Sequence, residues 1–166
     1  MSTQALPRQR QHEAWVRFLR AHAALTRQLS ADLVAAHGLT INDYEVLLHL
    51  ARAPDRMLRR VDLTGRVLLT ASGITRLLDG LERSALVERV ACDTDRRVVY
   101  ARLTEAGERK LREASRTHVA GIDELFTERF SEEERATLAS LLGRLSGAIP
   151  EGDGDAAQEC SAEDEG

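Results

Sequence analysis

Residues 70–84 carry two kinds of side chain at the spacing of a helix, and one kind could contact nucleic acid. An apolar set recurs at intervals of three and four residues: Ile74, Leu77, Leu78 and Leu81. A polar set has the same spacing: Ser72, Thr75, Arg76 and Asp79. Hydroxyl and guanidinium groups contact phosphates and base edges when a helix enters the major groove. Thr70 precedes the helix as its N-cap, and Gly73 lets another backbone come close. We therefore interpret 70–84 as a candidate recognition helix.

An ordinary amphipathic surface helix would show the same two faces. Two neighbouring features favour the nucleic-acid interpretation. A helical segment at 59–68 is followed by the short connection Leu68–Thr70, which is typical of a helix-turn-helix. A polar turn further along carries Arg96 and Arg97, which could reach into a minor groove, and Asp95 could hold one guanidinium by a charge-assisted hydrogen bond.

The sequence shows no comparable set of residues for metal binding, redox sensing or catalysis. The five histidines lack metal-binding spacing, and two cysteines cannot form a disulfide framework. Cys92 stands beside Asp93, whose charge disfavours the thiolate that a redox sensor or a thiol-dependent enzyme needs. No nucleophile with its base, phosphate-binding glycine loop or carboxylate pair is recognisable. We therefore expect no catalytic residues, no metal and no cofactor.

The charge is distributed unevenly along the 166 residues. The formal net charge is −4, but segment 150–166 contains seven acidic residues and no basic one. Residues 52–102 instead contain eleven arginines and seven acidic residues, which gives a local charge of +4. An approaching polyanion responds to charge within a Debye length, roughly 8 Å. The middle of the chain therefore favours a polyanionic partner in spite of the acidic total.

The elements that must position these residues follow from periodicity and capping. Apolar residues at intervals of three and four predict a long helix over 13–36, and Thr40 with Asp43 predicts the start of a second helix that ends at Ala53–Pro54. The β-branched stretches 87–91 and 98–103 predict a hairpin. Thr104 caps a helix expected from 105 to about 129. Ser131 and Glu134 form a capping box for a last helix that ends near Gly147.

These elements predict a mainly α fold with a small β-hairpin wing. We expect a flexible N-terminus over 1–12, one domain over 13–149 and, from its Gly, Asp and Glu content, an acidic disordered tail over 150–166. Within the domain, 40–104 would form a DNA-binding winged helix, and 13–37 with 105–146 a helical dimerisation region. The apolar runs fall far short of the roughly 20 residues of a membrane helix, and the polar N-terminus lacks a signal segment. We therefore expect a cytoplasmic protein.

Three motifs at these separations together resemble the MarR (multiple antibiotic resistance) family of bacterial transcriptional regulators. They are Ser-Gly-Ile-Thr-Arg from Ser72, Asp-Arg-Arg from Asp95 and Leu-Thr-Glu-Ala-Gly from Leu103. Each alone would be a chance match, and the similarity in helix order extends over 13–146. The resemblance implies a winged helix-turn-helix and a homodimer built from the first helix and the last two. It also implies double-stranded DNA as partner, with two recognition helices in successive major grooves of a pseudo-palindromic operator.

The residues support the dimer independently, because the small winged helix cannot cover the long apolar faces of the first and last helices. Packing of these faces on one another within a single chain is the alternative. The family also implies a small-molecule pocket between the dimerisation region and the winged helix. Residues that could line it for a phenolic or anionic effector are Trp15, His22, Tyr44, His49 and His118. Simple core packing of these rings is the alternative.

We therefore expect a cytoplasmic, homodimeric DNA-binding transcriptional regulator, a repressor that responds to a ligand. The competing hypothesis is a protein-interaction module that uses the winged helix and the acidic tail without binding DNA. The positive charge of 52–102 and the polar face of the candidate recognition helix favour DNA.

Overall fold

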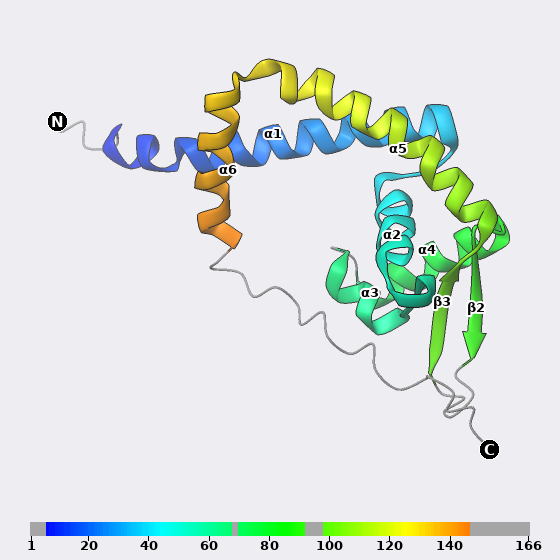
Figure 1. Ribbon diagram of the computed structural model, residues 1–166. Coiled ribbons are helices and arrows are strands. Elements are labelled where there is room, and N and C mark those ends of the chain that lie inside the picture. Colours follow the sequence, from blue (N-terminus) through cyan, green and yellow to red (C-terminus); the bar gives the residue numbers. More distant parts are fainter. Residues whose placement is uncertain (1–5, 68–69, 92–97, 147–166) are drawn as a thin grey trace.

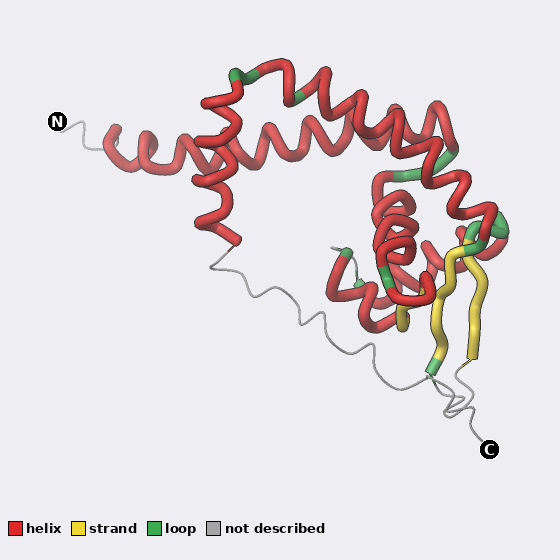
Figure 2. Tube along the Cα trace, in the orientation of Figure 1, coloured by secondary structure: helices red, strands yellow, loops and turns green. Residues whose placement is uncertain are grey.

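The computed structural model describes residues 6–67, 70–91 and 98–146. The described helices are α1 (Leu6–His37), α2 (Ile41–Arg52), α3 (Arg60–Arg66), α4 (Ala71–Arg83), α5 (Glu105–Leu125) and α6 (Glu132–Ser146). The described strands are β1 (Met57–Arg59), β2 (Val87–Ala91) and β3 (Val99–Leu103). Single turns of 3-10 helix cover Pro54–Arg56 and Thr127–Arg129. The mainly α fold with a small hairpin is therefore as predicted (Figure 2).

The elements form a small module beneath a pair of long helices. Figure 1 shows α2, α3, α4 and the strands gathered at one end of the molecule, while α1 and α5 run side by side above them. The N-terminal half of α1 projects well beyond the module. None of the described helices is long and apolar enough to cross a membrane.

The sheet has three antiparallel strands in the order β1-β3-β2. The predicted hairpin is confirmed, with Val87 opposite Leu103 and Ala91 opposite Val99. Strand β1 pairs with the other edge of β3 and was not predicted, because three residues are too few to show a strand pattern. The turn over 92–97, which contains Cys92, Asp95, Arg96 and Arg97, lies outside the described residues, as does the predicted acidic tail.

Local capping signals predicted the helix starts well. The Thr40 hydroxyl accepts from the Asp43 backbone N–H, while the Asp43 carboxylate accepts from the Thr40 N–H. Thr104 caps α5 by accepting from the N–H of Gly107 at 3.0 Å. Ser131 and Glu134 form the predicted capping box of α6. Each signal depends on residues three positions apart, so the sequence alone was sufficient.

Three helices differ in their limits from the prediction. Helix α3 ends at Arg66, before the predicted limit of 68, because Val67 has an extended conformation at φ −113° and ψ 134°. Helix α1 begins at Leu6 and not at 13, so residues 6–12, expected to be flexible, are helical. Pro7 is tolerated in a first helical turn, and the Arg and Gln residues after it are strong helix formers. Helix α5 ends at Leu125, because Phe126 leaves the helical conformation at φ −130° and ψ −59°. The Phe126 ring instead packs near that of Phe130.

One apolar core unites the module with the long helices. Its fully buried side chains come from α2, α3 and α4: Val46, Leu47, Leu50, Leu63 and Ile74. Leu33 of α1 and Ala114 of α5 are also fully buried in it. The winged helix therefore shares its core with residues outside the predicted limits of 40–104.

A close backbone contact joins the end of α4 to the start of α5. Thr104 donates from its hydroxyl to the Ala85 carbonyl at 2.7 Å and from its N–H to the Leu86 carbonyl at 3.1 Å. A Cβ at Gly107 would collide with the Leu86 carbonyl oxygen, so only glycine fits there. The Leu-Thr-Glu-Ala-Gly motif is thus a structural joint.

Candidate nucleic-acid interface

Helix α4 separates its two faces. Ile74, Leu78 and Leu81 are buried in the core. Ser72 and Arg76 are exposed, and Gly73, Thr75 and Asp79 are partly exposed. The helix therefore presents hydroxyl and guanidinium groups outward while its leucines anchor it to the module.

The start of α4 is organised by Thr70. Its hydroxyl accepts from the Gly73 N–H at 3.2 Å and lies 3.2 Å from the Ser72 hydroxyl. Two hydroxyls thus lie together at the N-terminus of a 13-residue helix, where the helix dipole favours negative charge. A phosphate group would suit this end of the helix electrostatically.

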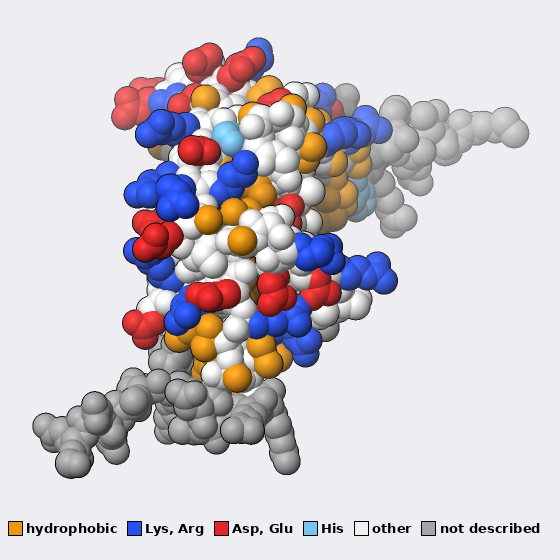
Figure 3. All heavy atoms as spheres, turned by 90° about the vertical axis from the view of Figure 1, so that its right-hand side faces the viewer, with side chains coloured by type: hydrophobic (Ala, Val, Ile, Leu, Met, Phe, Trp, Pro, Cys, Tyr) orange, Lys and Arg blue, Asp and Glu red, His pale blue; other side chains and the backbone are white. Residues whose placement is uncertain are grey.

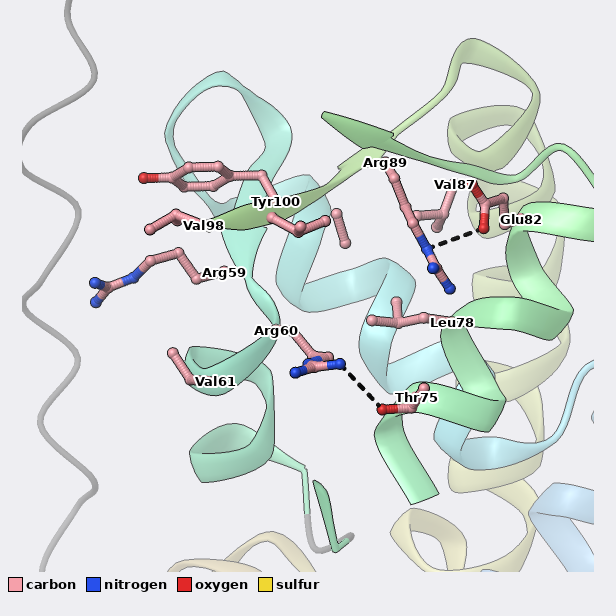
Figure 4. Close-up of a pocket in the computed structure, with 12 residues that line it drawn as sticks. Arg59, Arg60, Val61, Thr75, Leu78, Glu82, Val87, Arg89, Val98 and Tyr100 are labelled. Atoms are coloured by element: carbon pink, nitrogen blue, oxygen red, sulfur yellow. Dashed lines mark hydrogen bonds and ion pairs between the residues drawn. The ribbon is translucent and has the colours of Figure 1, made fainter. Parts of the chain in front are cut away.

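A neighbouring arginine contacts the middle of the polar face. Arg60, at the start of α3, donates from Nη1 to the Thr75 hydroxyl at 3.5 Å (Figure 4). Arg60 is itself exposed. The sequence analysis did not single out Arg60, because its proximity to Thr75 depends on how α3 packs against α4. A group that contacts the Thr75 hydroxyl would therefore also lie close to the Arg60 guanidinium.

A second arginine contacts the C-terminal half of the same face. Arg89 of β2 forms ion pairs with Asp79 and, at 3.0 Å from Nε to Oε2, with Glu82. The two arginines and α4 border a groove of about 260 Å³ whose apolar lining includes Leu78, Val87 and Ala101. Figure 4 shows Arg60 and Arg89 reaching toward α4 from opposite sides of this groove. Sequence reasoning placed Asp79 on the polar face but missed its partner.

Ion pairs neutralise part of the basic region. Within the described residues of 52–102, arginines pair with carboxylates at Arg56, Arg59, Arg89 and Arg102. On the face seen in Figure 3, basic and acidic side chains accordingly alternate. Arg76 has no such pair with a described residue and is exposed. Its positive charge is therefore available to a ligand.

Comparison with known proteins identifies the fold and its relatives. A model described as "MarR family" matches residues 37–98. The HTH-type transcriptional regulator MhqR of Bacillus subtilis (strain 168) is 36% identical over 109 residues, which cover 66% of this chain and 73% of that protein. This chain belongs to the MarR family of transcriptional regulators. The resemblance found in the sequence motifs is thereby confirmed.

Solved MarR-family structures have the same winged-helix fold. AbsC from Streptomyces coelicolor superposes with a TM-score of 0.74 at 32% identity, over 82% of this chain and 91% of AbsC. Sco3205 from the same organism, solved in complex with DNA, gives a TM-score of 0.76 at 27% identity, over 84% of this chain and 92% of Sco3205. In this winged-helix fold, β2 and β3 form the hairpin wing, and α4 directly precedes β2 in the chain.

The five residues predicted to line an effector pocket do not all lie together in the structure of this MarR-family chain. Tyr44 of α2 and His118 of α5 pack with ring centroids 4.6 Å apart and ring planes tilted by 45°, and the Tyr44 hydroxyl lies 3.2 Å from that of Ser115. Burial lowers the pKa of His118, and its Nδ1 is buried with no hydrogen-bond partner in the described part of the chain. Tyr44 and His118 thus form one group between α2 and α5.

The other three predicted residues do not join that pair through any described ring contact. Trp15 is 57% exposed on α1. Its ring centroid lies 6.2 Å from that of Phe18, and the Phe18 centroid lies 6.3 Å from that of His22. His49 lies on α2, where burial first and the charges of Arg66 and Arg52 second lower its pKa. Residues 6–67, 70–91 and 98–146 contain no group of three or more metal-ligating side chains that could hold an ion.

Proposed function

We propose that this MarR-family protein is a sequence-specific transcriptional repressor that binds double-stranded DNA as a homodimer and leaves it when an effector binds. The observation that carries the proposal is the outward polar face of α4, with Ser72 and Arg76 exposed opposite buried Ile74 and Leu78. The DNA complex of Sco3205, which has the same fold, supports it. The name of YetL of Bacillus subtilis (strain 168), a transcriptional repressor 32% identical to this chain, supports repression.

Each predicted contact has a distinct role. Ser72, Thr75 and Arg76 read base edges or phosphates in the major groove, and Thr70 and Gly73 bring the start of α4 to the backbone. In the turn that lies outside the described residues, Arg96 or Arg97 enters the minor groove and the other contacts phosphate or pairs with Asp95.

The exposed apolar surface supports the homodimer. The large exposed apolar side chains of the long helices include Trp15, Phe18 and Leu19 of α1 and Leu141 and Leu145 of α6. Such residues are rarely left together in water, and a second copy would cover them. A two-fold dimer would place its recognition helices about 34–36 Å apart, the length of one helical turn of DNA.

The effector response is proposed for the Tyr44–His118 pair. Its tilted rings, with a His118 Nδ1 that has no hydrogen-bond partner among the described residues, suit a phenolic or anionic molecule. An effector that favours another separation of the two recognition helices would weaken both half-site contacts together.

Fluorescence anisotropy with DNA tests the proposal. The purified protein selects its operator from random sequences, and operator and random duplexes are then titrated at low and high salt. Binding to DNA should weaken steeply with salt because counterions are released, and the operator should bind tighter by about 10³-fold or more. Failure to bind any duplex at low salt would reject the proposal and favour the protein-interaction module.

A further inference from the structure

We infer that Arg89 is a positioning residue that fixes the wing against the recognition helix by bridging Asp79 and Glu82, and that operator binding depends on this bridge. The inference rests on the proposed DNA binding. Arg89 belongs to β2, whereas both carboxylates belong to α4, so the bridge joins the two elements that would contact the same duplex.

The strand register explains why Arg89 meets α4. Side chains alternate between the two faces of a strand, so Val87 and Arg89 share one face and Glu88 points to the other. Val87 is buried in the core, which shows that this face is turned toward the module. Glu88 on the opposite face pairs instead with Arg102 of β3 at 2.8 Å.

The helix geometry explains why one guanidinium reaches two acids. Asp79 and Glu82 are three positions apart, which places them on the same side of α4. A guanidinium has five donors in a fixed planar fork, so it can bind both carboxylates and hold its strand at a defined angle to the helix. A lysine ammonium could not fix that angle as well.

The bridge is too exposed to be needed chiefly for folding. The side chains of Arg89, Asp79 and Glu82 are 46%, 40% and 41% exposed. Ion pairs in such exposed positions usually contribute little to the stability of the fold. We therefore expect the bridge to matter for the position of the wing relative to α4. A small displacement of the wing would prevent the wing and α4 from contacting the same duplex together.

The inference predicts a change in operator affinity opposite to the change that simple electrostatics predicts for the loss of an acidic residue. Removing a negative charge near a polyanion should strengthen DNA binding if only charge matters. If Asp79 and Glu82 hold Arg89 in place, neutralising them should weaken operator binding instead. Asp79→Asn with Glu82→Gln keeps the shape of both side chains while removing both charges.

The experiment compares operator affinity and its salt dependence for wild type, Asp79→Asn/Glu82→Gln, Arg89→Ala and the triple combination. We expect the neutral pair to bind operator about tenfold more weakly and Arg89→Ala to lose a similar factor with an unchanged salt slope. The triple variant should bind operator no more weakly than Arg89→Ala does, because Arg89→Ala alone already removes the whole bridge. Circular dichroism melting confirms that each variant folds.

The Glu88–Arg102 ion pair supplies the matched control. It lies on the same hairpin, with side chains 48% and 45% exposed, and Glu88→Gln removes one negative charge without touching α4. Glu88→Gln should bind operator as wild type does or slightly tighter.

Tighter operator binding by Asp79→Asn/Glu82→Gln would overturn the inference, and so would unchanged affinity. An Arg89→Ala variant that loses about one unit of salt slope and weakens operator and random DNA equally would make Arg89 a phosphate contact, which also overturns it. A wild-type protein that binds no DNA would instead reject the proposed function itself.

Discussion

The imidazole ring of His118 lies against the phenol ring of Tyr44, with the ring centroids 4.6 Å apart, and its buried Nδ1 has no hydrogen-bond partner among the described residues. The pair joins α5 to α2, so it connects the long helices to the module that contains α4. A protonated imidazole would bring an uncompensated charge into this contact.

Acid should therefore destabilise the protein through His118. Burial lowers its pKa in the folded state below the ordinary value of 6.5, so the unfolded chain binds more protons than the folded one. The stability that the neutral His118 contributes is fully present above pH 6.5, the ordinary pKa of histidine. This stability is lost as the pH falls from 6.5 through the lowered pKa of the folded state. Thermal unfolding of wild type and His118→Phe at about pH 8 and about pH 5 measures it. We expect a smaller loss of Tm in the variant, whose ring still packs on Tyr44; an equal loss would assign the acid sensitivity elsewhere.

Arg76 should discriminate between DNA sequences. Its exposed guanidinium lies on the outward face of α4 without a carboxylate partner in the described structure. Arg76→Ala should cost about 1–3 kcal/mol of operator binding and relax specificity at one base pair, if the side chain reads a guanine. Anisotropy titrations with operator, point-substituted operators and random DNA check this. Equal losses on all duplexes would demote Arg76 to a phosphate contact.

Phe18 should be required for the dimer. It is 40% exposed on α1, so a charged side chain there leaves the core of the single chain intact. Phe18→Glu should raise the dimer dissociation constant by the equivalent of about 2 kcal/mol or more, since buried aromatic residues dominate interfaces. Sedimentation velocity over a concentration series measures the effect. Val61→Glu is the control, because Val61 is 64% exposed on α3, outside the long helices. A Phe18→Glu protein that remains as dimeric as the control would contradict the proposed interface.

Ala85→Gly should stabilise the protein. Ala85, two residues beyond the end of helix α4, has φ 56°, and the Leu86 N–H donates to the Leu81 carbonyl at 2.9 Å. This left-handed position favours glycine, and an L side chain there costs about 1 kcal/mol. Denaturant unfolding should show a gain of about that size with an unchanged slope. A loss of stability would mean that the Ala85 methyl group makes favourable contacts that outweigh its backbone strain.

The sequence predicted what depends on near neighbours along the chain. The caps at Thr40, Thr104 and Ser131 and the two faces of α4 follow from spacings of three and four residues, so no tertiary information was needed. Contacts across elements could not be predicted in the same way. The approach of Arg60 to Thr75 depends on the packing of α3 against α4.

The effector residues show the same limit. Tyr44 and His118 are 74 positions apart, and only the packing of α5 on α2 brings their rings together. Trp15 and His22, which the family resemblance suggested as further lining residues, are instead exposed on α1. The family resemblance could suggest aromatic and histidine residues for a pocket, but it could not say which of them lie together in this chain.

The contact between Gly107 and the Leu86 carbonyl leaves no side chain between the first turn of α5 and the chain leaving α4. Side chains that separate two elements can change rotamer and so take up a small movement, whereas here the Gly107 backbone lies directly against that of Leu86. In the proposed homodimer, a tilt of α5 would therefore carry the C-terminal end of α4 with it. This direct mechanical linkage would let a shift of a fraction of a helical turn, far from the duplex, change how well two half-sites are matched.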